Sequence, residues 1–261
     1  MAIQSQQRVS PMSPMRLNVS YLLLAAALVV GGPARAMEDG TTTAKIASLK
    51  PYTAEYTTTA RGMSLTLKRE LKSDAKGNYT LTNGGKILVA GFHEVSVFRL
   101  EGERIAPKSY VYQGTGLINR RREGHFTPGS ETIRSLYKDT WYELPYTAGT
   151  LDRMSQQEQL RLSLLNDSSP NEDITLRVAD GKRIKDYQLV FVGEETLSTP
   201  LGDVDTLHFE RLRDDPDRKS DTWVAPGWDY MMVKTVHIED GKPVEVNLIK
   251  AALDGRSVAA R

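Results

Sequence analysis

Residues 231–250 have the sequence MMVKTVHIEDGKPVEVNLIK, in which two apolar runs flank an Asp-Gly pair. Asp-Gly is typical of two-residue hairpin turns, because the central positions of such turns need positive φ. The runs from Met231 to Ile238 and from Val244 to Ile249 alternate apolar with polar residues, as half-buried strands do. The stretch therefore predicts an antiparallel β-hairpin.

The same strand-and-turn pattern extends upstream to residue 51. It consists of short alternating runs separated by turn residues, including a second Asp-Gly pair at Asp180-Gly181. One segment differs. Residues 151–165 contain no Gly or Pro and have an apolar side, which predicts a helix with Thr150 or Asp152 as its cap. We therefore expect a mainly β fold, a curved antiparallel sheet forming an open barrel or two β layers, with one helix around residues 151–165.

The N-terminus has the three parts of a secretory signal peptide over residues 1–36. Arg16 precedes the apolar run Leu22–Val30, and small residues lead to cleavage between Ala36 and Met37. The run of nine residues is well short of the ~20 needed to span a bilayer. We expect export to the periplasm and a mature chain without a transmembrane segment; an uncleaved anchor is the alternative.

After the signal peptide, residues 37–50 are predicted to be a flexible leader, since they are rich in Thr, Ala and acids. Residues 51–250 form a single β-rich domain in this interpretation. The small and polar residues 251–261 are expected to be a frayed tail.

Composition excludes several classes of protein. Without Arg8, Arg16 and Arg35, which precede Met37, the 34 basic residues become 31 against 33 acidic ones, a net charge of about −2. A nucleic-acid-binding surface would need a basic excess, so no nucleic-acid partner is expected. The absence of cysteine excludes disulfides, thiolate metal sites and cysteine nucleophiles.

Three segments carry a family resemblance: Gly202–Arg211, Arg218–Pro226 and Val233–Leu248. Together they resemble the bacterial exported family called domain of unknown function 3108. The resemblance implies a secreted β-rich domain with no assigned activity. The chain departs from the expected pattern at Met232, where a nearby proline would be typical, and this departure concerns the bend entering the last hairpin.

One group of residues suggests a ligand. Arg218 could pair with a carboxylate or phosphate, next to Asp221 and the aromatic residues Trp223, Trp228 and Tyr230. These five residues are the predicted ligand-binding patch. The structural alternative is an Arg–Asp pair that fixes a loop while the tryptophans pack in the core.

A second basic feature is the run Arg120-Arg121-Arg122. It could contact an anion or a lipid headgroup. The simpler interpretation is a solvated strand or turn, because Glu123 and the acidic total weaken its field.

No catalytic residue, metal ligand or cofactor is predicted. Asp203 and Asp205 would share one face of a strand while His208 and Glu210 point the other way, so they cannot converge. The cluster Asp214-Asp215-Pro216-Asp217 lacks the EF-hand spacing and indicates a solvated turn. No His-Glu-x-x-His, Gly-x-Ser-x-Gly, P-loop or dinucleotide motif is present.

Three functional hypotheses remain from the sequence. The first is a non-enzymatic binding or scaffold protein for an apolar or envelope-derived ligand, such as a lipid or glycan, or for an envelope protein partner. The second is an envelope hydrolase with paired carboxylates. The third is an envelope assembly factor acting through an exposed strand edge, with Pro107 marking that edge.

Overall fold

The computed structural model describes residues 47–60, 63–87, 90–117, 119–167, 169, 171–213, 218–239 and 241–260. All described residues belong to one compact unit, Ala44–Arg261. The predicted signal peptide, its cleavage position at Ala36 and Met37, and the aspartates of residues 214–217 lie outside the described residues. No helix within the described part is long and apolar enough to cross a membrane.

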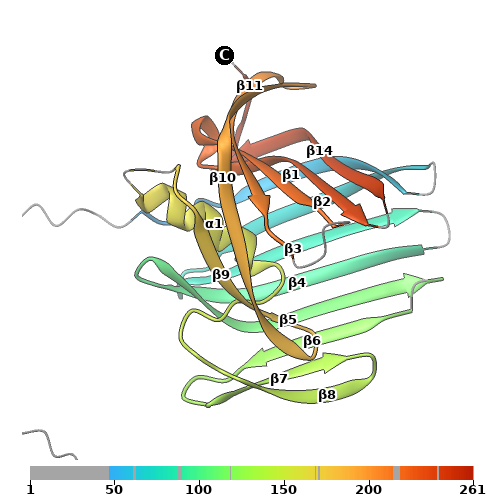
Figure 1. The fold of residues 1–261 in the computed structure, drawn as a ribbon, viewed down its shortest axis with the longest axis vertical. Coiled ribbons are helices and arrows are strands. Elements are labelled where there is room, and N and C mark those ends of the chain that lie inside the picture. The colour runs from blue at the N-terminus through green and yellow to red at the C-terminus, as the bar shows by residue number, and fades with distance from the viewer. Residues whose placement is uncertain are drawn as a thin grey trace, which may run out of the picture. The chain divides into compact units, whose positions relative to one another are not determined.

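The described residues form one antiparallel sheet that curls into a nearly closed barrel (Figure 1). Fourteen strands follow one another in the order β8-β7-β6-β5-β4-β3-β2-β1-β14-β13-β12-β11-β10-β9, and β15 pairs with β14 alone. The strands are β1 (Tyr52–Ala60), β2 (Met63–Ser73), β3 (Asn78–Ile87), β4 (Ala90–Glu101), β5 (Arg104–Gly116), β6 (Arg121–Phe126), β7 (Thr132–Tyr137), β8 (Thr140–Pro145), β9 (Ile174–Asp180), β10 (Arg183–Thr199), β11 (Gly202–Arg211), β12 (Ser220–Ala225), β13 (Met231–Glu239), β14 (Lys242–Leu253) and β15 (Arg256–Ser257). The mainly β, antiparallel, open-barrel prediction is confirmed.

Two contacts hold the sheet in its nearly closed form. Strand β1 pairs with β14, from Tyr52 opposite Leu253 onward, so the first and last long strands are neighbours. At the other side, Leu151 forms a parallel bridge to Val178 of β9, donating its N–H to the Arg177 carbonyl at 2.8 Å. The chain that leaves β8 therefore covers the free edge of β9.

One α-helix lies among the described residues, α1 (Ser155–Asn166), and a 3-10 turn, η1 (Pro226–Trp228), follows β12. The prediction of a helix here is correct, but the first turn expected from residue 151 is not helical, because Leu151 is bonded to β9. The N-cap of the helix is Met154 rather than Thr150 or Asp152, but Asp152 still supports the first turn: its Oδ1 accepts the backbone N–H groups of Met154 and Ser155, both at 2.8 Å. The helix contacts β5 and β9.

The core lies between this helix and the inward faces of the strands. Alternate strand residues are buried because successive side chains of a strand point to opposite faces. The fully buried aromatic side chains Tyr56, Phe98 and Phe209 come from β1, β4 and β11, and fully buried leucines such as Leu71 of β2 and Leu162 of α1 accompany them.

A buried ionic cluster ties α1 to β1 and β2. The Glu158 carboxylate accepts hydrogen bonds from the Tyr52 hydroxyl at 2.7 Å, from Arg69 at 3.1 Å and from Arg161 at 2.7 Å. Arg69 also donates to the Tyr52 hydroxyl, and the Arg161 guanidinium lies 4.8 Å from the Tyr52 ring centre. All four side chains are buried, with exposed fractions from 1% to 7%. Charged groups are found at such depth only when they are paired.

The two Asp-Gly hairpins differ by one residue in register. Glu239 pairs with Lys242, so the β13–β14 loop contains residues 240 and 241, as predicted. Asp180 instead pairs with Arg183, which makes Gly181-Lys182 the loop and leaves Asp180 in the strand. Gly181 has φ +67°, and its turn touches β7, where the Ser135 hydroxyl donates to the Gly181 carbonyl at 2.6 Å.

Both ends of the predicted domain need correction. Residues 251–260 are not a frayed tail, because β14 runs to Leu253 and the Ala260 N–H donates to the Leu201 carbonyl at 3.0 Å. At the other end, the predicted flexible leader stops short of residue 50: Leu49 is 2% exposed, and the Ala47 N–H donates to Asn166 at 2.8 Å. In each case backbone hydrogen bonds compensate for the lost chain freedom.

Replacing Gly181 with Ala should destabilise the protein by about 1–3 kcal/mol. The positive φ disfavours any side chain, and a Cβ would lie 2.9 Å from Cδ2 of Tyr137. Gly129→Ala is the matched control, since Gly129 has φ +77° and nothing within 4 Å of an added Cβ. Urea unfolding measures the free energy of unfolding of both variants. Equal decreases in this free energy would show that the contact with Tyr137 contributes nothing.

Replacing Glu158 with Gln should lower the free energy of unfolding at pH 7 by about 3 kcal/mol, because two buried guanidiniums lose their counter-charge. Burial alone would raise the pKa of Glu158, but Arg161 and Arg69 outweigh burial and hold this pKa below its ordinary value of 4.5. A lowered pKa stabilises the fold above pH 4.5, and this contribution is lost as the pH falls through the folded value.

The difference between wild type and Glu158→Gln should therefore be constant from pH 7 to pH 5 and shrink below pH 4.5. Glu143→Gln is the control, since Glu143 forms an exposed pair with Arg134 at 3.5 Å and should cost less than ~1 kcal/mol. A pH-independent difference in chemical unfolding experiments would contradict the assignment.

Candidate functional site

The five residues of the predicted ligand-binding patch lie at different places in the barrel. Arg218 lines a basic hollow, and Asp221 and Trp223 belong to an aromatic cluster on β11 and β12. Trp228 lines a second hollow near the C-terminus, and Tyr230 lines a small buried cavity beside α1. The structure therefore does not bring them together as one site.

The cluster around Trp223 is packed and hydrogen-bonded. The indole stacks on the His208 ring with centroids 4.2 Å apart, and its Nε1 donates to Glu195 at 2.7 Å. Asp221 is 2.9 Å from Nε2 of the same histidine. With Trp223 only 8% exposed, this arrangement favours the structural interpretation of Trp223 and Asp221.

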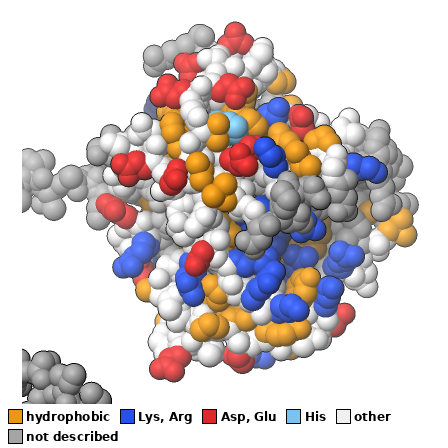
Figure 2. Space-filling view, in the orientation of Figure 1, with side chains coloured by type: hydrophobic (Ala, Val, Ile, Leu, Met, Phe, Trp, Pro, Cys, Tyr) orange, Lys and Arg blue, Asp and Glu red, His pale blue; other side chains and the backbone are white. Residues whose placement is uncertain are grey.

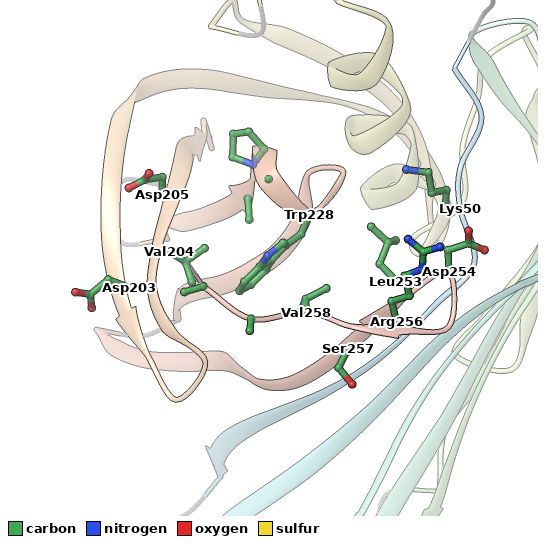
Figure 3. A pocket seen from close by; sticks show the side chains of 15 residues that line it. Lys50, Asp203, Val204, Asp205, Trp228, Leu253, Asp254, Arg256, Ser257 and Val258 are labelled. Atoms are coloured by element: carbon green, nitrogen blue, oxygen red, sulfur yellow. The ribbon is translucent and has the colours of Figure 1, made fainter.

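The hollow near the C-terminus has a volume of about 910 Å³ and is shown in Figure 3. Its walls include apolar side chains such as Trp228 and Val204. Its acids do not face each other at close range: Asp203 and Asp205 lie on the side opposite Asp254 (Figure 3). No group of three or more His, Asp or Glu side chains in the described part of the chain could hold a metal ion.

The basic hollow has the most uniform chemistry. It has a volume of about 340 Å³ and lies where the β9–β10 hairpin meets β6, β7 and the end of β11. Among the described residues that line it there are two tyrosines, one acid and eight cations: Tyr137, Tyr187, Asp180, Arg122, Arg153, Lys182, Arg183, Lys185, Arg211, Arg213 and Arg218. Figure 2 shows lysine and arginine side chains gathered in the middle of one face of the molecule.

Strand alternation brings several of these cations to the hollow. Lys185 and Tyr187 are on the face of β10 that also carries the core residue Leu189, two positions further on. In β6, Arg122 is on the face of the buried residues Gly124 and Phe126. Cations thus occupy positions where the same strands elsewhere carry core side chains.

The single acid, Asp180, is held by two of these cations. It forms ion pairs with Arg153 and Lys185. Burial would raise the pKa of Asp180, but Lys185 and Arg153 outweigh burial and lower it to about 2. Asp180 is therefore fully ionised at neutral pH, and among the cations that line the hollow it pairs with Arg153 and Lys185.

Arg211 is a half-buried cation of the group. Its guanidinium carbon lies 3.1 Å from the centre of the Tyr187 ring, and its Nε is buried with no hydrogen-bond partner among the described residues. Burial lowers the pKa of Arg211, Tyr187 partly offsets this effect, and neighbouring Arg213 lowers it further. Arginine stays charged under such shifts, so the site keeps a partly desolvated cation with a free donor.

A comparison with protein families identifies the chain. The family described as "Protein of unknown function (DUF3108)" matches residues 78–242. The chain belongs to this family. The match includes all eight cations of the basic hollow, as well as Asp180, so the hollow lies within the DUF3108 domain.

The fold has a solved counterpart outside the family. The DUF3108 chain is similar to a crystal structure of a beta-barrel-like protein of domain of unknown function DUF1849 from Brucella abortus. The TM-score is 0.51 and the identity 11%, over 78% of this chain and 98% of that one. At this identity the likeness shows the fold alone. No curated protein matches the chain.

Sequence reasoning found only part of the basic hollow. Arg218 was predicted as a ligand residue, and Arg122 lies in the basic run singled out as a possible anion contact. The remaining cations were missed because they are scattered along the chain. A usable signal exists in retrospect: Arg183 and Lys185, and likewise Arg211 and Arg213, are two residues apart, the spacing of one strand face.

Proposed function

We propose that this DUF3108 protein is an exported, periplasmic, non-enzymatic binding protein whose ligand carries phosphate or carboxylate groups held in the basic hollow. One observation carries the proposal: eight cations and a single acid, among the described residues, surround a hollow of about 340 Å³. Such a volume is in the range of small-molecule sites.

The chemistry of the hollow favours an anion with more than one charged group. Several guanidiniums can each donate two hydrogen bonds to a phosphate or carboxylate, and charge-assisted bonds of this kind are stronger than neutral ones. A concave site lined by one sign of charge also concentrates the field and the counter-ion. Tyr137 and Tyr187 add aromatic surface for the uncharged part of a ligand.

An apolar ligand in the interior is less well supported. The cavity between α1 and the sheet has a volume of only about 60 Å³, which is too small for an acyl chain. The larger C-terminal hollow has mixed walls, because charged residues line it beside the apolar ones: Lys50, Asp203, Asp205, Asp254 and Arg256. A phosphorylated or carboxylated part of an envelope-derived lipid or glycan is therefore the ligand we favour.

The two other hypotheses gain no support from specific observations. For a hydrolase, the acids of the C-terminal hollow are divided between its two sides, with Asp203 and Asp205 on one and Asp254 on the other (Figure 3). For an assembly factor, Pro107 is not at a sheet edge: it lies in β5, between β4 and β6, beside a bulge opposite Val97 and Phe98. The edge of β9 is covered by Leu151.

Removing Lys182 and Arg183 together by substitution with Ser should weaken binding of inorganic pyrophosphate or citrate about tenfold or more. Both side chains are exposed, so the fold should tolerate the change. Lys242→Ser with Lys250→Ser is the matched control, because it removes two exposed cations from β14 far from the hollow in the sheet order. Isothermal titration calorimetry at two salt concentrations gives the affinities.

Asp180→Asn should act in the opposite direction and tighten binding of the same probes, since Arg153 and Lys185 would lose their acidic partner. Opposite signs for the two kinds of variant cannot come from a general loss of stability. The proposal fails if the wild-type protein binds neither probe, or if both double variants weaken binding equally.

A further inference from the structure

The small cavity beside α1 is distinct from the basic hollow and has an unusual balance of charge. Its volume is about 60 Å³, and it lies between α1, β1, β2, β11, β12 and β13. The described residues that line it include three guanidiniums, Arg69, Arg161 and Arg211, and one carboxylate, Glu158. Arg69 and Arg161 are 7% and 3% exposed.

Arg161 has one hydrogen-bond donor at this cavity that is not used by the described residues. Its Nη1 donates to Glu158 at 2.7 Å, and its Nε donates to the Asp229 carbonyl at 3.1 Å. Its Nη2 is buried and has no hydrogen-bond partner among the described residues. Arg211 also lines the cavity, and its Nε is likewise buried without a hydrogen-bond partner among the described residues.

Water alone would satisfy these donors but not the charge. A buried charge without a counter-charge is costly, and Glu158 compensates only one of the two deeply buried guanidiniums. The other polar groups that line the cavity include the Thr222 hydroxyl, which can donate to an anion, whereas the Ser220 hydroxyl accepts from Arg213 and lies 2.8 Å from His237 Nδ1. A volume of this size accepts a monatomic ion with one or two waters.

We propose that the cavity beside α1 is a binding site for a small monovalent anion of the size of chloride, held by Arg161 Nη2 and Arg211. The anion supplies the second counter-charge of the Arg69–Glu158–Arg161 cluster and locks α1 against β1 and β12. The proposal does not rest on the ligand of the basic hollow, since Arg211 is the one described residue that lines both sites.

The test uses the full-length protein and halide ions as probes. Chloride is titrated into protein whose ionic strength is kept constant with sodium gluconate, an anion too large for the cavity. Chemical unfolding should show a stabilisation that sets in near the dissociation constant: above it, each tenfold rise in chloride lowers the unfolding equilibrium constant about tenfold. An identical unfolding curve at every chloride concentration would overturn the proposal.

Bromide-soaked crystals locate the ion. We expect an anomalous peak within hydrogen-bonding distance of Arg161 Nη2. A peak found only in the basic hollow, or a site at Arg161 that shows water density without anomalous signal, would overturn the assignment.

Two variants distinguish loss of chloride binding from a general loss of stability. Arg161→Lys keeps the charge paired with Glu158 but removes Nη2. The chloride affinity obtained from the unfolding titration should fall at least tenfold. Arg153→Lys is the matched control, since Arg153 lines the basic hollow and not the cavity, and should keep the full chloride effect. If Arg161→Lys does not fold, Arg211→Gln tests the same site while leaving the cluster around Glu158 intact. An undiminished chloride effect in whichever variant folds would overturn the proposal.

Discussion

The carboxylate of Glu158, buried between Arg69 and Arg161, is the interaction on which the barrel depends. Replacing such a cluster with apolar residues can leave a protein equally stable, so its main contribution is specificity. The helix can pack on the sheet in one rotational setting only, because a turn by one residue would carry Glu158 away from its partners and leave two guanidiniums unpaired. With α1 fixed on β1 and β2, the chain before it must pass beside β9, where Leu151 forms its bridge and closes the barrel.

The sequence predicted the architecture better than the site, and for a physical reason. Period-two alternation and turn residues are local, so the strands, the antiparallel hairpins and one helix could be inferred from short windows. Register is less local. The Asp180-Gly181 pair predicts a turn at these two residues, but the loop is Gly181-Lys182, so that Asp180 stays in β9 and Gly181 lies against Tyr137. The convergence of cations from β6, β10 and β11 depends on closure of the barrel, which no window contains.

Aromatic residues were a misleading guide to the site in this chain. Trp223 and Trp228 drew attention because large aromatic side chains supply much of the contact area in binding sites. Trp223 is instead covered by polar neighbours, His208 on its face and Glu195 at its Nε1. Net charge was equally uninformative. A formal charge of +1 for the chain says nothing of where charges gather: in the described part, eight cations line one hollow, and it is the local charges that determine the field there.

Arg211 makes the two proposed anion sites dependent on each other, since it lines both the basic hollow and the cavity beside α1. An ion in the cavity would neutralise part of the positive potential that a ligand meets in the hollow, because the Arg211 guanidinium lies between the two sites. Occupation of either site must then weaken the other, and by linkage the two effects are equal in free energy. A stabilising ion at α1 would therefore moderate the affinity of the hollow, so that a strongly charged ligand could be released as well as captured.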